Sequence, residues 1–279
     1  MKVFDTAQSC VEYLSTCNRP LGMVPTMGAL HAGHFSLIEK STTENQITLV
    51  TIFINPTQFD NKNDLENYPT DLASDLSEIE KLGEGLIVYA PGINDVYGSQ
   101  IHSKPYDLGG LDLVMEGEKR AGHFQGVATV VEYFLTTFDP DHAYFGEKDF
   151  QQLCIIRHLV SSLQLKTKII GCPTVRESDG LAMSSRNRLL NPSQRALAPK
   201  LHQALHLAKN QAKKIPYRQI KALVADQFEA TSDLRLDYFS IANPETLQEL
   251  LPEEPIGRGR AFIAAFLGKI RLIDNLDMS

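Results

Sequence analysis

The amino-acid sequence predicts an α/β protein built on a doubly wound parallel sheet and followed by a second, smaller α+β domain. Short apolar runs alternate with segments of helical periodicity over about the first 175 residues, which is typical of a parallel, Rossmann-like sheet with helices on both faces. After Leu190, two helical segments precede several strand-like runs, an order that indicates an α+β arrangement. We therefore expect one domain over residues 1–175 and another over residues 176–279.

Apolar runs that stop at a turn signal predict the strands of the first domain. Residues 47–54 are the clearest case, because a near-continuous β-branched run suits a strand covered on both faces. The expected strands are residues 21–24, 47–54, 86–90, 142–145 and 168–172. Helical spacing or long buried runs predict helices after Asp5-Thr6 and over residues 35–40, 70–82, 127–138 and 150–163. Residues 91–126 are glycine-rich with mixed charge and are expected to form an irregular loop.

The second domain is predicted to begin with two amphipathic helices. One starts at residues 191–193 and carries an apolar stripe of Leu197, Leu201, Leu205 and Ala208. The other starts at Pro216 and carries Ile220, Leu223, Val224 and Phe228. Strands are then expected at residues 234–241, 261–267 and 270–273, with a turn at Gly268-Lys269 between the last two.

Composition narrows the class of function. The 279 residues are 43% hydrophobic and 22% charged, as in an ordinary globular protein. The net charge of -7 and the pI near 5.6 argue against a general nucleic-acid or anionic-membrane surface. The sequence has neither an apolar leader nor a run of about 18 apolar residues. We therefore expect no nucleic acid or membrane partner and a cytoplasmic location.

The four cysteines suggest neither a redox nor a zinc site. The sequence has no C-x-x-C pair among its four cysteines, which are Cys10, Cys17, Cys154 and Cys172. We therefore expect all four to be reduced. Cys154 and Cys172 lie in apolar segments and are expected to be buried, whereas Cys10 and Cys17 are expected to be partly exposed.

The stretch Leu21–Lys40 joins a short strand, a glycine-bearing turn and the start of a helix. Such a unit at the carboxyl end of a parallel sheet favours a nucleotide phosphate, because helix N–H groups and the helix dipole attract anions there. His31 and His34 form an H-x-G-H pair that can hydrogen-bond phosphate oxygens and carry positive charge. Taken alone, the pattern fits an ordinary βα turn equally well.

Two further loops carry polar residues suited to the same edge, and a segment at the domain boundary carries another polar set. Gln58 follows the strand at residues 47–54, and Lys148, Asp149 and Gln152 follow the strand at residues 142–145. A third segment, residues 183–186, reads Met-Ser-Ser-Arg and offers two hydroxyls and a guanidinium, a set suited to a triphosphate.

An early H-x-G-H with a late M-S-S loop resembles the HIGH-motif nucleotidyl transferase superfamily. Five blocks, in order over residues 24–188, more closely resemble the pantothenate synthetases, the pantoate–β-alanine ligase family. These blocks are VPTMGALHAGH, INPTQF, GHFQGV, FGEKDFQQL and PTVRESDGLAMSSRN.

The resemblance implies a two-step, ATP-dependent ligation. The carboxylate of pantoate attacks the α-phosphorus of ATP, pyrophosphate leaves, and the amine of β-alanine then displaces AMP to give pantothenate, a coenzyme A precursor. The substrates supply both nucleophiles, so the protein is expected to supply positioning and positive charge. ATP is expected as its Mg²⁺ complex, and Asp71 and Asp75 are candidates to lie near the metal, although no spacing fixes its ligands in the chain and we assign none. The resemblance also implies a homodimer.

The resemblance also assigns roles to residues. Gln58 and Gln152 would hold pantoate, Gln58 would also contact β-alanine, and Val175 would present its backbone to adenine. Residues expected to act in catalysis are His31, His34, Lys148, Ser184, Ser185 and Arg186. Residues expected to bind ATP are Met27, Gly28, Ala29, Leu30, His31, Ala32, Gly33, His34, Gly146, Glu147, Lys148, Asp149, Val175, Met183, Ser184, Ser185 and Arg186.

Two departures from the family pattern matter. Ala121 stands where the family has proline after Arg120, which loosens that loop and leaves Arg120 as either a substrate contact or a surface residue. Ser185 stands where the wider superfamily often has lysine, so Arg186 and Lys148 would have to supply that charge. The alternatives are another nucleotidyl transferase of the superfamily, acting on a phosphate or alcohol, and a nucleotide-binding module without activity.

Overall fold

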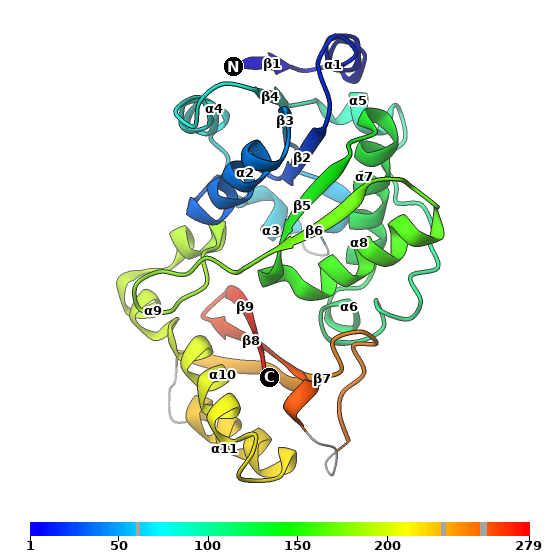
Figure 1. Ribbon diagram of the computed structural model, residues 1–279. Helices are drawn as coiled ribbons and strands as arrows, with labels where there is room; N and C mark the ends of the chain where they lie inside the picture. Colours follow the sequence, from blue (N-terminus) through cyan, green and yellow to red (C-terminus); the bar gives the residue numbers. More distant parts are fainter. Residues whose placement is uncertain (60–61, 230–232, 252–255) are drawn as a thin grey trace. The chain divides into compact units, whose positions relative to one another are not determined.

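The structure is a computed structural model and describes residues 1–59, 62–229, 233–251 and 256–279 (Figure 1). The chain divides into two compact units, residues 1–173 and 174–279. The first contains a six-stranded parallel sheet and the second a three-stranded antiparallel sheet, so the predicted fold class is confirmed. Among the described residues, no helix is both long and apolar enough to cross a membrane.

The parallel sheet has the strand order β1-β4-β3-β2-β5-β6. From the central β2 the chain moves outward through β3 to β4 on one side, then crosses to β5 and β6 on the other. The switch point of the sheet therefore lies between β2 and β5, where ligands of doubly wound sheets bind at the carboxyl ends of the strands. The strands are β1 (Lys2–Phe4), β2 (Leu21–Thr26), β3 (Ile47–Ile52), β4 (Leu86–Tyr89), β5 (His142–Gly146) and β6 (Lys168–Cys172).

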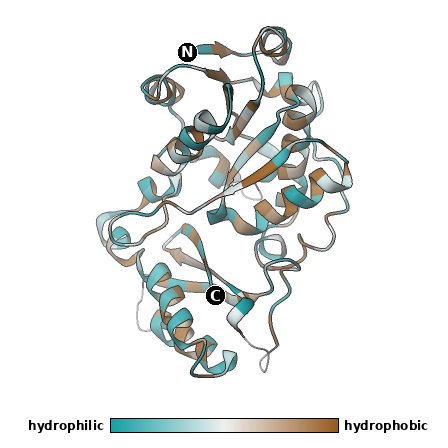
Figure 2. Cartoon of the chain, viewed as in Figure 1, coloured by the Kyte–Doolittle hydropathy of each residue, from teal (hydrophilic) through white to brown (hydrophobic). Residues whose placement is uncertain are grey.

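Helices cover both faces of this sheet, which explains why its inner strands carry long hydrophobic stretches (Figure 2). Helices α2 and α4 pack on one face around Ile38, Val50 and Ile79, and α7 packs on the other, where Phe134 and Phe138 contact Tyr89. The helices of the unit are α1 (Ala7–Leu14), α2 (Ala32–Glu44), α3 (Lys62–Glu66), α4 (Leu72–Glu80), α5 (Ile93–Tyr97), α6 (Met115–Lys119), α7 (His123–Phe138) and α8 (Phe150–Ser162). Two 3-10 turns, η1 (Pro56–Gln58) and η2 (Glu147–Asp149), follow β3 and β5.

The second unit packs α10 and α11 on its antiparallel sheet, whose order is β7-β8-β9. Its core joins the helix residues Leu205, Ile220 and Val224 to Ile263 and Ala265 of the sheet. The elements are η3 (Ser185–Leu189), α9 (Pro192–Leu197), α10 (Lys200–Gln211), α11 (Tyr217–Glu229), β7 (Leu234–Ala242), η4 (Ile256–Arg258), β8 (Arg260–Leu267) and β9 (Ile270–Asp277).

Several expectations about the elements were wrong. Strand β1 was not predicted, because three mostly exposed edge residues give no apolar run. The expected loop at residues 91–126 contains α5 and α6, which are too short to show a helical period. The single helix expected from residues 191–193 is two, α9 and α10, separated at Pro199, which lacks a backbone N–H group. On α11, Leu223 leaves the buried stripe and is 40% exposed.

Two of the cysteine expectations were also wrong. Cys10 is fully buried on the inner side of α1, whereas Cys154 is only half-buried on α8. The buried Cys172 and half-buried Cys17 agree with the expectations. Burial raises the pKa of Cys10 to about 12 and that of Cys172 to about 11, because a thiolate loses its hydration inside the protein.

Candidate active site

The turn after β2 has an unusual backbone conformation. Gly28 has φ +79° and Ala29 has φ +51°, so two successive residues are left-handed. A side chain at Gly28 would also lie 2.9 Å from an oxygen of Asp75, which leaves glycine as the residue that fits. The hydroxyl of Thr26 accepts the Gly28 N–H at 3.2 Å and donates to the Thr51 carbonyl at 2.8 Å, tying the turn to β3.

Asp75 holds this turn from the first turn of α4. Its two carboxylate oxygens accept the N–H groups of Ala29 and Leu30, each at 2.8 Å. Asp75 is buried, with only 4% of its surface exposed. Sequence reasoning missed this contact, which joins positions more than forty residues apart along the chain. These two turn N–H groups therefore point to a carboxylate of the protein.

The predicted H-x-G-H pair brings two imidazoles together at the start of α2. His31 is the N-cap residue, and its Nδ1 accepts the Gly33 N–H at 3.1 Å. When His31 is neutral, its proton is therefore on Nε2. The rings of His31 and His34 lie with their centroids 4.1 Å apart, tilted by 32°. Both residues are half-buried.

Gln58 is also part of this region. Its Nε2 lies 2.8 Å from the sulfur of Met27, so the two predicted residues are neighbours. Asn55, which caps η1, donates from Nδ2 to the Gln58 side-chain oxygen at 3.1 Å and to the Gly126 carbonyl at 3.0 Å. The Asn55 side-chain oxygen in turn accepts from Tyr97 and from the Thr57 hydroxyl. Burial raises the pKa of Tyr97, which keeps its hydroxyl protonated as a donor.

A histidine and an arginine fix the backbone of Gln58 from the side of α7. His123 Nδ1 lies 2.7 Å from the Gln58 carbonyl, and Arg120 Nη1 lies 3.0 Å from His123 Nε2. Because a carbonyl only accepts, Nδ1 carries the proton and Nε2 accepts from the guanidinium. Arg120, expected to be either a substrate contact or a surface residue, is thus bonded within the protein. Sequence reasoning missed the role of His123, although it lies in the block GHFQGV.

The loop after β5 carries the other predicted cluster of the first unit. β2 pairs with β5 in parallel (Met23 opposite Ala143), so this loop leaves the same edge of the sheet as the turn after β2. Lys148 is 18% exposed and its Nζ lies 3.4 Å from Asp149 Oδ1. Gln152 is half-buried on the first turn of α8. Lys148 and Asp149 belong to the 3-10 turn η2, and residues 146 and 147 lie at its start.

The remaining predicted residues belong to the second unit. A hairpin at residues 176–182 turns at Gly180, with φ +91°. Arg176 anchors the hairpin through a bidentate pair with the buried Asp274, at 2.7 and 3.0 Å. The Met183 N–H donates to the Val175 carbonyl at 3.0 Å, so these two predicted residues are adjacent.

The serine segment forms the start of η3. Ser184 caps η3 and its hydroxyl accepts the Arg186 N–H at 3.3 Å. Ser185 is buried, with 6% exposure, whereas Ser184 and Arg186 are half-buried. Ser184–Arg186 therefore form one compact cap within the second unit.

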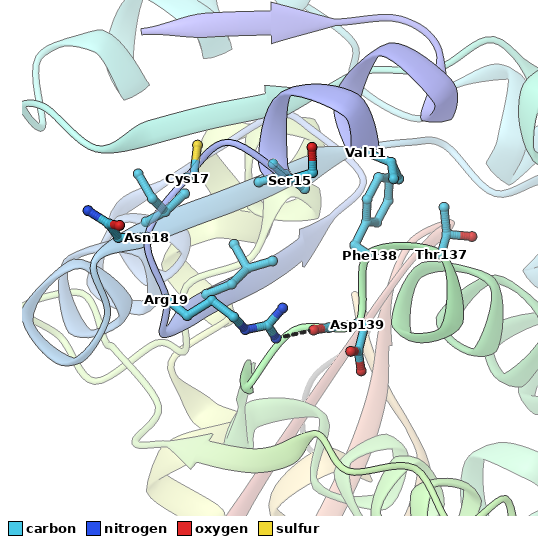
Figure 3. A pocket seen from close by; sticks show the side chains of 11 residues that line it. Val11, Ser15, Cys17, Asn18, Arg19, Thr137, Phe138 and Asp139 are labelled. Carbon is cyan, nitrogen blue, oxygen red and sulfur yellow. Dashed lines mark hydrogen bonds between the residues drawn. The ribbon is translucent and has the colours of Figure 1, made fainter.

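A cavity of about 200 Å³ lies at the opposite, amino-terminal edge of the parallel sheet (Figure 3). Leu21 and Ile47, the first residues of β2 and β3, form part of its wall. Arg19 beside it donates to Asp141 Oδ2 at 2.9 Å and to the Asp139 carbonyl. None of the predicted site residues lines this cavity.

Comparisons with known proteins agree on one family. The family model described as Pantoate-beta-alanine ligase matches residues 2–277. The pantothenate synthetase of Flavobacterium psychrophilum is 44% identical over 260 residues, covering 93% of this chain and 92% of that protein. The pantothenate synthetase of Christiangramia forsetii is 43% identical over 282 residues, covering 100% of both.

Solved structures are similar over the whole chain. The pantothenate synthetase of Thermus thermophilus has a TM-score of 0.92 at 38% identity, covering 100% of this chain and 99% of that one. The pantoate-beta-alanine ligase of Francisella tularensis, complexed with beta-gamma ATP and beta-alanine, has a TM-score of 0.83 at 33% identity, covering 100% and 98%.

Proposed function

The chain belongs to the pantoate–β-alanine ligase family, and from this premise we propose that it joins pantoate to β-alanine through a pantoyl adenylate, releasing AMP and pyrophosphate. The observation that carries the proposal is the group at the β2 turn. Two imidazoles 4.1 Å apart lie at a helix start, and Gln58 contacts Met27 of the preceding turn. Imidazole N–H donors suit phosphates, and a neutral amide suits a carboxylate and a hydroxyl.

The chemistry requires charge compensation more than a protein nucleophile. In the first step a pantoate carboxylate oxygen forms a bond to the α-phosphorus, and the bond to pyrophosphate breaks. In the second step the β-alanine amine attacks the acyl carbon, loses a proton, and AMP departs. Negative charge builds on the departing pyrophosphate, so donors preorganised there stabilise the transition state. We assign this task to His31, His34 and Lys148.

The role of His31 follows from its hydrogen bond. Its Nδ1 accepts from Gly33, so Nε2–H is the group that can donate to a phosphate oxygen. His34 lies beside it and can share that negative charge. Gln58 and Gln152 would bind pantoate without adding a charge that blunts the carboxylate nucleophile. Gln58 is well suited to this, because its backbone and side chain are both held by neighbours.

We assign ATP binding and pantoate binding to the first domain, residues 1–175, and the loop that closes on ATP to the start of the second. Val175, the last residue of the first domain, would face adenine. Within the closing loop, Met183, Ser184, Ser185 and Arg186 would cover the phosphates and exclude water. ATP would enter as its magnesium complex, in which Mg²⁺ neutralises phosphate charge. We also propose a homodimer in the cytoplasm, which light scattering and fractionation would test.

ATP–pyrophosphate exchange tests the proposal. We expect exchange only when pantoate is present, because the carboxylate must attack before labelled pyrophosphate can return to ATP. Adding β-alanine should then yield pantothenate and AMP in equal amounts. Exchange that ignores pantoate would contradict the ligase assignment. Exchange supported only by a phosphorylated or alcohol acceptor would favour the other nucleotidyl transferases, and its complete absence would favour a binding module.

A further inference from the structure

We propose that Asp75 is a positioning residue for the first half-reaction: its carboxylate fixes the turn that carries His31 and His34. The inference rests on the proposed function, because it concerns the step in which ATP is attacked. Asp75 itself would touch neither ATP nor pantoate. It acts through the two N–H groups that it accepts from Ala29 and Leu30.

The contact is bidentate and buried. Each oxygen of Asp75 accepts one N–H, both at 2.8 Å, and the residue is 4% exposed. Ala29 and Leu30 are 1% and 3% exposed, so water cannot easily replace the carboxylate. Removing one acceptor oxygen would leave a buried N–H group without its partner, a change that backbone groups tolerate poorly.

The turn needs this support because of its conformation. Gly28 and Ala29 both have positive φ, and Ala29 carries a side chain that disfavours it. Asp75 also touches the open face of Gly28, where a Cβ would come within 2.9 Å of its oxygen. Helix α4 and the turn therefore fit together by shape as well as by hydrogen bonds.

The turn that Asp75 holds is joined by one peptide bond to His31, which carries the first imidazole. Leu30 precedes His31, the N-cap of α2, and the carbonyl of His31 accepts the N–H of His34 at 2.8 Å. A shift of the turn would move the His31 ring and the first turn of α2 together. Misplacing a group by about 1 Å can cost roughly 100-fold in rate.

The test compares Asp75→Asn with Asp71→Asn. Asp71 caps the same helix by accepting the Ser74 N–H at 3.0 Å, and asparagine caps equally well, so this control removes a charge without touching the turn. We expect Asp75→Asn to lower pantoate-dependent ATP–pyrophosphate exchange at least tenfold. Its use of chemically prepared pantoyl adenylate with β-alanine should change less than threefold. Asp71→Asn should match the wild type in both assays.

A double-mutant cycle shows whether Asp75 acts through the histidines. If it does, adding Asp75→Asn to His34→Ala should lower exchange less than threefold further. Losses that multiply, together with a tenfold rise in the Mg²⁺ concentration for half-maximal exchange, would mean that the carboxylate acts on the metal and would overturn the proposal. An equal loss in both half-reactions would indicate general damage and overturn it as well.

Asp75→Glu protects the test against poor folding of the asparagine variant. It keeps the charge and both acceptors but carries them one methylene further from α4, so exchange should again fall at least tenfold. Wild-type exchange in either folded variant would refute the positioning role alone. Wild-type protein without pantoate-dependent exchange would refute the proposed function first, and this inference with it.

Discussion

Replacing Gly126 by alanine should separate α7 from the turn that carries Gln58. A Cβ at this position would lie 2.3 Å from the Thr57 carbonyl oxygen and 2.7 Å from the Gln58 nitrogen. Both are backbone atoms, so no flexible side chain can move aside. The oxygen contact is about 1 Å shorter than an ordinary one, and the turn must shift by about that distance. Overpacking of this kind costs about 1–3 kcal/mol, or roughly 2–12 °C in Tm.

The assay measures Tm and the kcat/KM for pantoate in the same preparations. Because a shift of about 1 Å can cost roughly 100-fold, we expect kcat/KM for pantoate to fall by about 10- to 100-fold. Gly92→Ala is the matched control, since nothing lies within 4 Å of its added Cβ and its φ of -75° suits alanine. An unchanged Tm and an unchanged kcat/KM for pantoate in Gly126→Ala would refute the packing argument.

Three further predictions concern charge and burial. His34→Ala and Lys148→Ala should each lower exchange about 100- to 1000-fold, the loss of one preorganised donor, while Tm changes little. Arg176→Lys should lower the free energy of unfolding in urea by about 1.5–3 kcal/mol, because lysine cannot keep the bidentate pair with buried Asp274. Above pH 9, unfolding should release the Cys10 proton, because its pKa of about 12 in the folded state falls toward the ordinary thiol value of 9.0 when unfolded. Stability in urea should therefore fall with rising pH by about 1.4 kcal/mol per pH unit, and less steeply in Cys10→Ala.

Each of these has an outcome that would contradict it. Near-normal exchange in both donor variants would mean that the phosphate site lies elsewhere. Equal urea midpoints for Arg176→Lys and the wild type would show that the ion pair contributes nothing net, as some buried pairs do. A pH slope that is unchanged in Cys10→Ala would assign the alkaline loss of stability to other groups, such as Cys172, whose pKa is about 11.

The parts of the fold that sequence predicts well are those that one run of side chains determines. Residues 47–52 form β3 because β-branched apolar residues suit a strand buried on both faces. The α4 cap was predictable from Asp71 followed by helical spacing. By contrast, β1 exists only because β4 offers a pairing edge, with Val3 opposite Val88. Nothing local in Lys2–Phe4 reveals that edge.

The same division holds for the candidate site. The imidazole pair is local, since His34 follows His31 by three positions at a helix start, and the sequence predicts it. The supports are not local: Asp75 and His123 each meet the site across more than forty positions. In the sequence alone, no local pattern links the Asp75 carboxylate or the His123 imidazole to the turns that they hold. Their roles appear only when the fold brings α4 and α7 to the carboxyl edge of the sheet.

The two hydrogen bonds that Asp75 accepts from Ala29 and Leu30 set a limit on transplanting this motif. A designer who copied residues 27–34 onto another strand–helix scaffold would bring the histidines but not the carboxylate from α4. The left-handed pair at Gly28 and Ala29 would then have to be held by solvent or by a new acceptor. We expect the smallest portable unit to be the strand, the turn, α2 and the first turn of α4 together, so a designed enzyme should be built around that assembly.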